Sequence, residues 1–586
     1  MLMRILKLLL TLSLASLLLA QIPPLDSRNL RVSGTNTDFS AEVYRAWPPA
    51  GPLATWEQRK AGLRRQILIA AGLDPMPPRT PLNPRISGRI DGDGFTVDKV
   101  WLETMPGYFL AGNLYRPKGK RGPFPGIASP HGHWTNGRAE QTEIGNIPAR
   151  GVSLAQHGFV VFNYDMVGYS DTKQTPHVFG NPTEQLWSFG PLGLQLWNSI
   201  RVVDFLESLP EVDKTKLAAT GASGGGTQTF LLTAVDDRIR VSAPVNMVSA
   251  IMQGGSPCEN APGLRVETYN VEIASLMAPR PMLLVSATGD WTHNVPRDEF
   301  KRVQGIYEKY DHKSDVEVVQ IDAPHNYNQA SREAVYDFLA RKLQGARGGW
   351  KEGPIRKFDL NELLIGSLPE GAIDFSRIFA NWREQATRQS AAMTVEALRD
   401  RLRRTIGAAW PDKVEALNAA GQLIVLSRPG VGDRIPGRWF PGSGKAVLVV
   451  HPAGSAAAEQ ERSVQRLITQ GRSVLLIDAY QTGATRAPRE EAGKYYSTFQ
   501  RTDDARRVQD ILTAMRWLQL AGYKDAELQG IEAGQIWAAF AAAIGPSLQA
   551  SLPKEYKGTD EDLLRDFSVP GIQRAGGVET LRRLLQ

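Results

Sequence analysis

The segment from Lys216 to Val235 constrains the fold most, because it joins a strand, a tight turn around a serine and a helix. Its centre, Gly221-Ala222-Ser223-Gly224-Gly225, fits the pattern G-x-S-x-G. In such a turn the serine hydroxyl is exposed above a helix N-terminus, and the strained backbone needs small neighbours. The same letters also fit a turn that only joins a strand to a helix. The strand–turn–helix context favours Ser223 as a nucleophile.

Composition and charge indicate a globular protein of several domains. The chain has 586 residues, of which 42% are hydrophobic and 22% are charged. Its net charge of +7 is small for this length, and we find no nucleic-acid-binding motif. Cys258 is the only cysteine, so no intrachain disulfide can form and a cysteine-based metal site is not expected. We therefore expect no nucleic-acid partner, no metal and no cofactor; the oligomeric state stays open.

The N-terminal segment 1–20 has the parts of a secretory signal peptide. Arg4 and Lys7 come before the apolar run from Leu8 to Leu19, and Ala20 is a small residue at a candidate cleavage site. The apolar run is short for a membrane span. We expect a periplasmic or secreted protein with no membrane association after cleavage, and an uncleaved N-terminal anchor is the alternative.

The order of sequence features in the first half occurs again in the second half. The helical leader around Thr55 corresponds to one around Thr394, and apolar strands end at His131 and at His451. The serine turn is echoed by Gly530-Ile531-Glu532-Ala533-Gly534. Strands that alternate with helices predict a parallel sheet covered on both faces. We therefore predict the α/β class, with tandem α/β-hydrolase domains. Each would be a mostly parallel sheet with helices on both faces and a helical N-terminal leader.

The expected domain organisation follows from this repeat and from the Gly-, Arg- and Pro-rich stretch at 344–353. It consists of a signal peptide (1–20), a helical leader with loops (21–94), a catalytic α/β-hydrolase domain (95–345), a linker with a second helical leader (346–421) and a degenerate α/β-hydrolase-like domain (422–586). Any two α/β units share an alternation of strands and helices. The ungapped match of the two leaders and the two elbow-like turns favour common descent.

The remaining members of a catalytic triad are expected in the order acid, then histidine. His325 follows the apolar strand that ends at Ile321 and precedes a helix, where this fold places its base. Asp290 follows the preceding strand and is the candidate acid, which would orient the imidazole. Asp322 is the rival acid, whereas His293 is expected at the rim of the Asp290 loop.

Two further sets of residues are expected around Ser223. The backbone N–H of Gly224 and that of His133 or Trp134 are candidates for the oxyanion hole. A zinc site at His131 and His133 would lack a third partner in the sequence. Trp134 and Trp291 could stack on a sugar ring, whereas Trp187 and Trp197 fit core or lid packing at least as well.

The first half, over roughly residues 40–345, resembles secreted bacterial α/β-hydrolases of the acetyl xylan esterase-like group. The resemblance lies in His131-Gly132-His133-Trp134, in the Ser223 elbow with Thr227-Gln228-Thr229-Phe230, in Gly289-Asp290-Trp291-Thr292 and in Ala323-Pro324-His325-Asn326-Tyr327-Asn328. It implies that Ser223, Asp290 and His325 are nucleophile, acid and base. Related carbohydrate esterases act on methyl esters of uronic acids, and the sequence does not exclude that activity. The Arg and Lys typical of glucuronoyl esterases after the elbow serine are missing here.

The second half departs from this pattern. Glu532 stands at the nucleophile position, and no histidine follows His451. We expect a degenerate domain that braces the first one or binds polysaccharide.

For the whole chain we predict a secreted serine esterase that deacylates or de-esterifies plant-type polysaccharide or oligosaccharide through an acyl-enzyme. The alternatives are a prolyl-oligopeptidase-type serine peptidase and a non-catalytic two-domain carbohydrate-binding protein.

Overall fold

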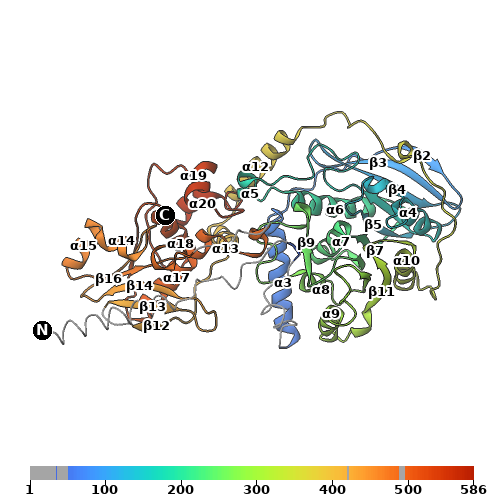
Figure 1. Ribbon diagram of the computed structural model, residues 1–586. Helices are drawn as coiled ribbons and strands as arrows, with labels where there is room; N and C mark the ends of the chain where they lie inside the picture. Colours follow the sequence, from blue (N-terminus) through green and yellow to red (C-terminus); the bar gives the residue numbers. More distant parts are fainter. Residues whose placement is uncertain (1–33, 36–50, 419–421, 488–494) are drawn as a thin grey trace.

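The computed structural model describes residues 34–35, 51–418, 422–487 and 495–586, which form two α/β units side by side (Figure 1). The predicted signal peptide lies outside the described residues. Within the described part of the chain, no helix is both long and apolar enough to cross a membrane.

The first unit is built on a nine-stranded, mostly parallel sheet with the order β11-β10-β8-β7-β5-β6-β4-β3-β2. Its strands are β2 (Arg85–Asp91), β3 (Phe95–Met105), β4 (Tyr108–Pro117), β5 (Phe124–Pro130), β6 (Val160–Tyr164), β7 (Val212–Ala222), β8 (Ile239–Val245), β10 (Met282–Gly289) and β11 (Val316–Pro324). The strands from β11 to β6 pair in parallel, and the edge formed by β4, β3 and β2 is antiparallel. The predicted α/β-hydrolase fold is confirmed by this order.

Helices cover both faces of this sheet because successive residues of its buried strands point to opposite sides. Ile127, for example, faces one apolar cluster, whereas Ala128 faces another. Helices α4 (Ile147–Gln156) and α10 (Gln329–Gln344) pack on the first side, and α6 (Pro191–Ser208) and α7 (Gly224–Val235) on the second. The other helices of this unit are α3 (Leu53–Ala70), α5 (Pro182–Leu186), α8 (Asn270–Ser275) and α9 (Glu299–Glu308). A short β1 (Gly34–Thr35) pairs with β9 (Met252–Gly254).

The second unit has a six-stranded sheet with the order β12-β13-β14-β16-β15-β17. Its strands are β12 (Glu415–Asn418), β13 (Leu423–Ser427), β14 (Ile435–Phe440), β15 (Ala446–Val450), β16 (Ser473–Ile477) and β17 (Glu527–Gly530). This is the order of the first sheet from β2 to β7. The parallel part is short, because the second sheet ends at β17 where the first continues with β8, β10 and β11. Among the described residues, the strands that precede Asp290 and His325 in the first unit have no counterpart here.

Helices also surround the second sheet and join the two units. They are α11 (Leu360–Leu363), α12 (Phe375–Ala391), α13 (Val395–Ile406), α14 (Ser455–Gln460), α15 (Arg462–Thr469), α16 (Tyr496–Phe499), α17 (Asp503–Leu520), α18 (Gly534–Ile544), α19 (Asp560–Asp566) and α20 (Gly577–Leu585). The two predicted leaders are α3 and α13, and Arg65 of α3 forms a 2.5 Å ion pair with Asp400 of α13.

The C-terminal segment of the second unit packs on the first. Asp560 accepts a hydrogen bond of 3.0 Å from the indole of Trp187, and the backbone N–H of Gln573 donates to Leu186 at 2.9 Å. One continuous cluster of buried apolar side chains includes residues of both units. The two units are therefore joined by core packing as well as by the linker.

Candidate active site

The serine turn has the backbone of a nucleophile elbow. Ser223 links β7 to α7 with φ of 57° and ψ of −126°, a conformation that a non-glycine residue seldom adopts. The turn is possible because its neighbours lack side chains. A Cβ on Gly225 would lie 2.8 Å from the carbonyl oxygen of Pro130, and one on Gly221 would lie 2.6 Å from that same oxygen. The tight packing of β7, α7 and the end of β5 thus holds the serine at the C-terminal ends of the parallel strands.

The loop that follows β5 lies directly over this elbow. A Cβ added to Gly132 would meet the Ala222 carbonyl oxygen at 2.7 Å and Cβ of Ser223 at 3.0 Å. Similarly, a Cβ on Gly224 would lie 2.8 Å from the ring of His133. The predicted oxyanion loop and the predicted nucleophile are therefore in contact distance of each other.

The two remaining predicted triad residues form a hydrogen-bonded pair. Nδ1 of His325, which follows β11, lies 2.9 Å from Oδ2 of Asp290, which follows β10. The Asp290 side chain is 2% exposed, and its Oδ1 accepts from the backbone N–H of Thr292 at 2.7 Å and from the Thr292 hydroxyl. Both carboxylate oxygens are thus fixed, and the carboxylate favours the tautomer of His325 with the proton on Nδ1.

The other ring nitrogen of His325 faces the site without a partner. Nε2 is buried and has no hydrogen-bond partner among the described residues. It is free to accept a proton, as a general base must. The hydrogen bond from Ser223 to Nε2 that the predicted triad requires is not formed in this structure, so the triad stays a prediction. Catalytic hydrogen bonds of this kind often tighten only when substrate binds.

Two indoles enclose the imidazole of His325. The ring of Trp291 lies 4.3 Å from it between centroids, and the ring of Trp134 lies 6.4 Å away in a stacked arrangement. Both tryptophans are partly exposed, as the predicted substrate contacts would need to be. Trp187 and Trp197 are instead buried in the apolar core, with exposures of 8% and 0%.

The structure distinguishes the candidate oxyanion donors. Gly224 is the first residue of α7, where backbone N–H groups have no acceptor within the helix. The backbone N–H of Trp134 donates to the carbonyl of Gly132 at 2.8 Å, so it is already used. For the N–H of His133 the described residues provide no acceptor, which favours it as the second donor.

The rival residues have other partners. Asp322 accepts from the hydroxyl of Thr288 at 2.7 Å and is not bonded to His325. His293 is exposed and lies 2.7 Å from the carbonyl oxygen of Asp290, at the rim of that loop.

His131 is not available as a metal ligand, because both of its ring nitrogens have partners. Nδ1 lies 2.7 Å from the Gly132 carbonyl oxygen, and Nε2 accepts from the backbone N–H of Met166 at 2.9 Å. Burial lowers the pKa of His131 to about 3, so the ring is neutral. The zinc site at His131 and His133, which the sequence offered only as a competing idea without a third partner, is therefore not formed by this pair.

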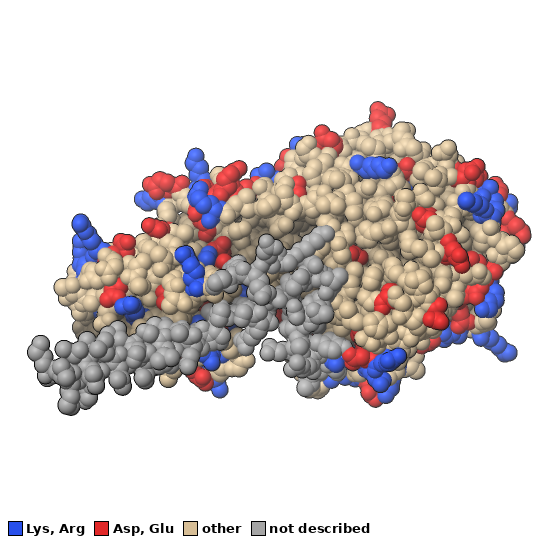
Figure 2. Space-filling model, viewed as in Figure 1, with Lys and Arg blue, Asp and Glu red and all other residues tan. Residues whose placement is uncertain are grey.

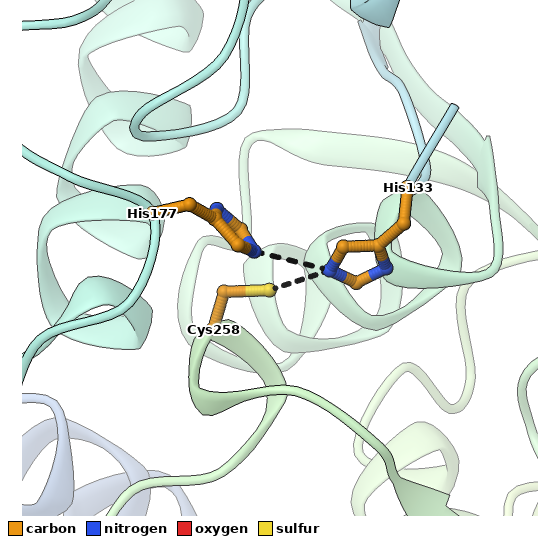
Figure 3. Close-up of side chains that lie close together, drawn as sticks. All are labelled: His133, His177 and Cys258. Atoms are coloured by element: carbon orange, nitrogen blue, oxygen red, sulfur yellow. Dashed lines mark hydrogen bonds between the residues drawn. The ribbon is translucent and has the colours of Figure 1, made fainter. Parts of the chain in front are cut away.

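His133 instead lies beside His177 and Cys258, two residues that sequence reasoning missed (Figure 3). Its Nε2 is 3.2 Å from Nε2 of His177 and 3.2 Å from Sγ of Cys258. Desolvation and the nearby His325 lower the pKa of His133 to about 4, and burial raises the pKa of the Cys258 thiol. The separations along the chain are 44 and 125 residues, so no local motif marks the cluster.

The second unit has an elbow-like turn without the other parts of a triad. Glu532 stands between β17 and α18 with φ of 50°, close to the value at Ser223. His451 follows β15, and its Nδ1 accepts from the backbone N–H of Ala453 at 3.0 Å. The predicted correspondence of the two turns is therefore present in the backbone.

Comparison with known proteins agrees with this fold. No protein-family model matches the chain. The Bacillus subtilis (strain 168) protein "Putative hydrolase YtaP" is 25% identical over 257 residues, which are 39% of this chain and 81% of that protein. The solved structure of Methylesterase BT1017 matches with 28% identity and a TM-score of 0.50, over 62% of this chain and 82% of that one. The chain is thus similar to hydrolases, one of them an esterase.

Proposed function

We propose that this protein is a serine esterase that removes small acyl or alkyl groups from esterified polysaccharide or its oligosaccharides. The observation that carries the proposal is the Asp290–His325 pair at the same sheet edge as the elbow serine. Similarity to a methylesterase at 28% identity supports the reaction class.

In the proposed reaction, Ser223 forms a bond from Oγ to the ester carbonyl carbon while its proton passes to Nε2 of His325. The N–H groups of Gly224 and His133 would stabilise the negative charge that develops on the carbonyl oxygen. His325 then returns the proton to the leaving alcohol as the C–O bond breaks. Water, deprotonated by His325, then attacks the acyl carbon, and the bond from this carbon to Oγ of Ser223 breaks as His325 returns the proton to Oγ. Asp290 stabilises the charged imidazole throughout.

A cavity between the two units supports a polysaccharide substrate. Its volume is about 660 Å³, and its walls include Phe179, Tyr495 and Tyr496. They also include Val178 and Pro257, the neighbours of His177 and Cys258, but none of the three proposed triad residues. Flat aromatic faces of this kind can stack on sugar rings. Residues of the second unit hold one wall in place, since the backbone N–H of Arg265 donates to Thr498 at 2.8 Å. We infer that the second unit shapes a sugar-binding subsite and lacks activity of its own.

The surface charge of the protein and its N-terminal segment agree with the proposed substrate and location. On the face shown in Figure 2, basic and acidic side chains are interspersed and no large patch of one sign is visible. This arrangement suits a neutral or weakly charged polymer better than a nucleic acid. Segment 1–20 would direct the protein to the periplasm or the medium.

The test is ester hydrolysis by Ser223→Ala, with Ser208→Ala at the end of α6 as the matched control. We expect Ser223→Ala to lose p-nitrophenyl acetate hydrolysis and fluorophosphonate labelling, while the control keeps both. Activity of Ser223→Ala within a few-fold of the wild type would exclude the assignment. Acetate and methanol release from esterified xylans and pectins then identifies the ester, and chromogenic peptides assayed in parallel would detect a peptidase instead.

A further inference from the structure

Three side chains from separate loops converge at one point beside the active site. His133 lies in the loop after β5, His177 in the loop after β6, and Cys258 in the single turn of 3₁₀ helix at Pro257–Glu259 (Figure 3). Their Nε2, Nε2 and Sγ atoms all lie within 4.8 Å of one another. Among the described residues, this is the group of histidine, cysteine and acidic side chains that meets the geometry of a metal site.

The distances are close to the edges of a tetrahedral zinc site. Bonds of about 2.0–2.1 Å to nitrogen and about 2.3 Å to sulfur place two nitrogens about 3.3 Å apart and a nitrogen and a sulfur about 3.6 Å apart. The observed values are 3.2 Å for His133 to His177 and 3.2 Å for His133 to Cys258. The first agrees with the zinc-bound edge, and the second is shorter than it by about 0.4 Å, so the cysteine would move outward slightly on binding. Nε2 of His133 has either one lone pair or one proton, yet it faces both Nε2 of His177 and Sγ of Cys258. A cation between them would satisfy all three atoms.

The surrounding contacts prepare these side chains for coordination. Nδ1 of His177 lies 2.7 Å from the carbonyl oxygen of Val167, so this nitrogen carries the proton and Nε2 presents its lone pair to the cluster. The ring of Tyr169 packs edge-on against both imidazoles, with centroids 6.2 Å from His133 and 4.8 Å from His177.

We propose that His133, His177 and Cys258 bind one Zn²⁺ ion, with a fourth position open to water or another ligand. Two imidazoles and a thiolate select a borderline-soft ion such as zinc over magnesium or calcium. On binding, the Cys258 thiol gives its proton to solvent and the thiolate coordinates the metal.

The proposed ion would tie together three segments that are distant in the sequence. It would also fix the ring of His133, which lies directly beside Gly224. A Cβ added to Gly224 would be 2.8 Å from Cε1 of His133. The site therefore adjoins the active site but uses none of the side chains proposed for ester cleavage. Zinc binding consequently stands or falls independently of the esterase assignment.

Cobalt provides the direct test, because thiolate-bound Co²⁺ absorbs in the near ultraviolet and tetrahedral Co²⁺ has strong visible bands. Chelator-treated full-length protein would be titrated with Co²⁺ and then with Zn²⁺, and its thermal midpoint measured with and without Zn²⁺. We expect one equivalent to bind with both absorption features, displacement by Zn²⁺, and a raised midpoint.

Variants show whether these residues hold the ion. Cys258→Ser should lose the thiolate absorption, and His177→Gln should bind at least about 100-fold more weakly, since even partners of ligands contribute about 10–100-fold. His312→Gln is the matched control, because that histidine pairs with Asp315 at 2.7 Å on the surface. Absence of the thiolate band in the wild type, or unchanged zinc affinity in both ligand variants, would overturn the proposal.

Discussion

Replacing Asp290 with asparagine tests the reasoning about the active site most directly, because it changes one atom of a fixed carboxylate. Oδ1 accepts from the backbone N–H of Thr292 at 2.7 Å, so the amide oxygen of the variant should take that position. The amide NH₂ would then stand where Oδ2 lies 2.9 Å from Nδ1 of His325. A donor at this place requires a lone pair on Nδ1 and moves the imidazole proton to Nε2.

This change of tautomer removes the base and the charge that stabilises the imidazolium. Nε2 could no longer accept a proton from Ser223, and in the described part of the chain Asp290 is the carboxylate that pairs with His325. We expect kcat to fall by about 10³–10⁴-fold, which corresponds to about 4–5.5 kcal/mol in the activation free energy. The fold should persist, because the shape of the side chain is unchanged.

The assay is p-nitrophenyl acetate hydrolysis at neutral pH, with thermal unfolding as the check on folding. Asp322→Asn is the matched control, since Asp322 is bonded to Thr288 and not to the histidine. It should retain activity within about twofold of the wild type. A loss smaller than about tenfold in Asp290→Asn, or an equal loss in Asp322→Asn, would refute the assignment of acid and base.

Three further predictions concern packing, pH and the second unit. Gly132→Ala places a Cβ 2.7 Å from the Ala222 carbonyl oxygen and should lower both kcat/KM and stability, the latter by about 1–3 kcal/mol, whereas Gly62→Ala in open space on α3 should not. Burial, with the charge of Asp433, raises the pKa of Asp510 to about 7. The folded protein thus holds a proton that the unfolded chain releases near pH 4, so wild-type stability falls from about pH 4 to pH 7. Denaturant titrations should therefore show that the free energy of unfolding of Asp510→Asn rises relative to that of the wild type between about pH 4 and pH 7, by at most about 4 kcal/mol, and not further above about pH 7. A difference that does not change with pH would contradict this prediction. Adding Glu532→Ser to Ser223→Ala should restore neither ester hydrolysis nor fluorophosphonate labelling, since β17 ends the second sheet; recovered labelling would show a working second site.

Local patterns in the sequence predicted the parts of the site that depend on chain order. The elbow at Ser223 follows from one strand–turn–helix segment, and the pairing of Asp290 with His325 follows from the adjacency of β10 and β11. Side chains that meet through loop packing were not predictable in this way. His177 and Cys258 come from loops whose paths depend on the whole fold, and neither loop has a metal-binding spacing.

The second sheet shows the same limit at the level of topology. The repeat of features predicted two related units, and the strand order confirms the likeness as far as β17. The balance of parallel and antiparallel strands could not be foreseen, because it depends on where the sheet stops. Likewise, the ion pair of Arg65 with Asp400 joins two leaders that the sequence shows only as similar helices.

Glu532, with its positive φ, shows that the backbone of an elbow can form without the residues that make an elbow reactive. That backbone conformation persists although the described residues include no strand that would place a base or an acid beside it. It therefore serves the abrupt return of the chain from sheet to helix. A sharp turn of this kind has a structural role in the fold, and its reactivity depends on the side chains that lie around it. For unfamiliar sequences, the neighbours contributed by later strands are therefore a better guide to hydrolysis than the glycine-flanked corner itself.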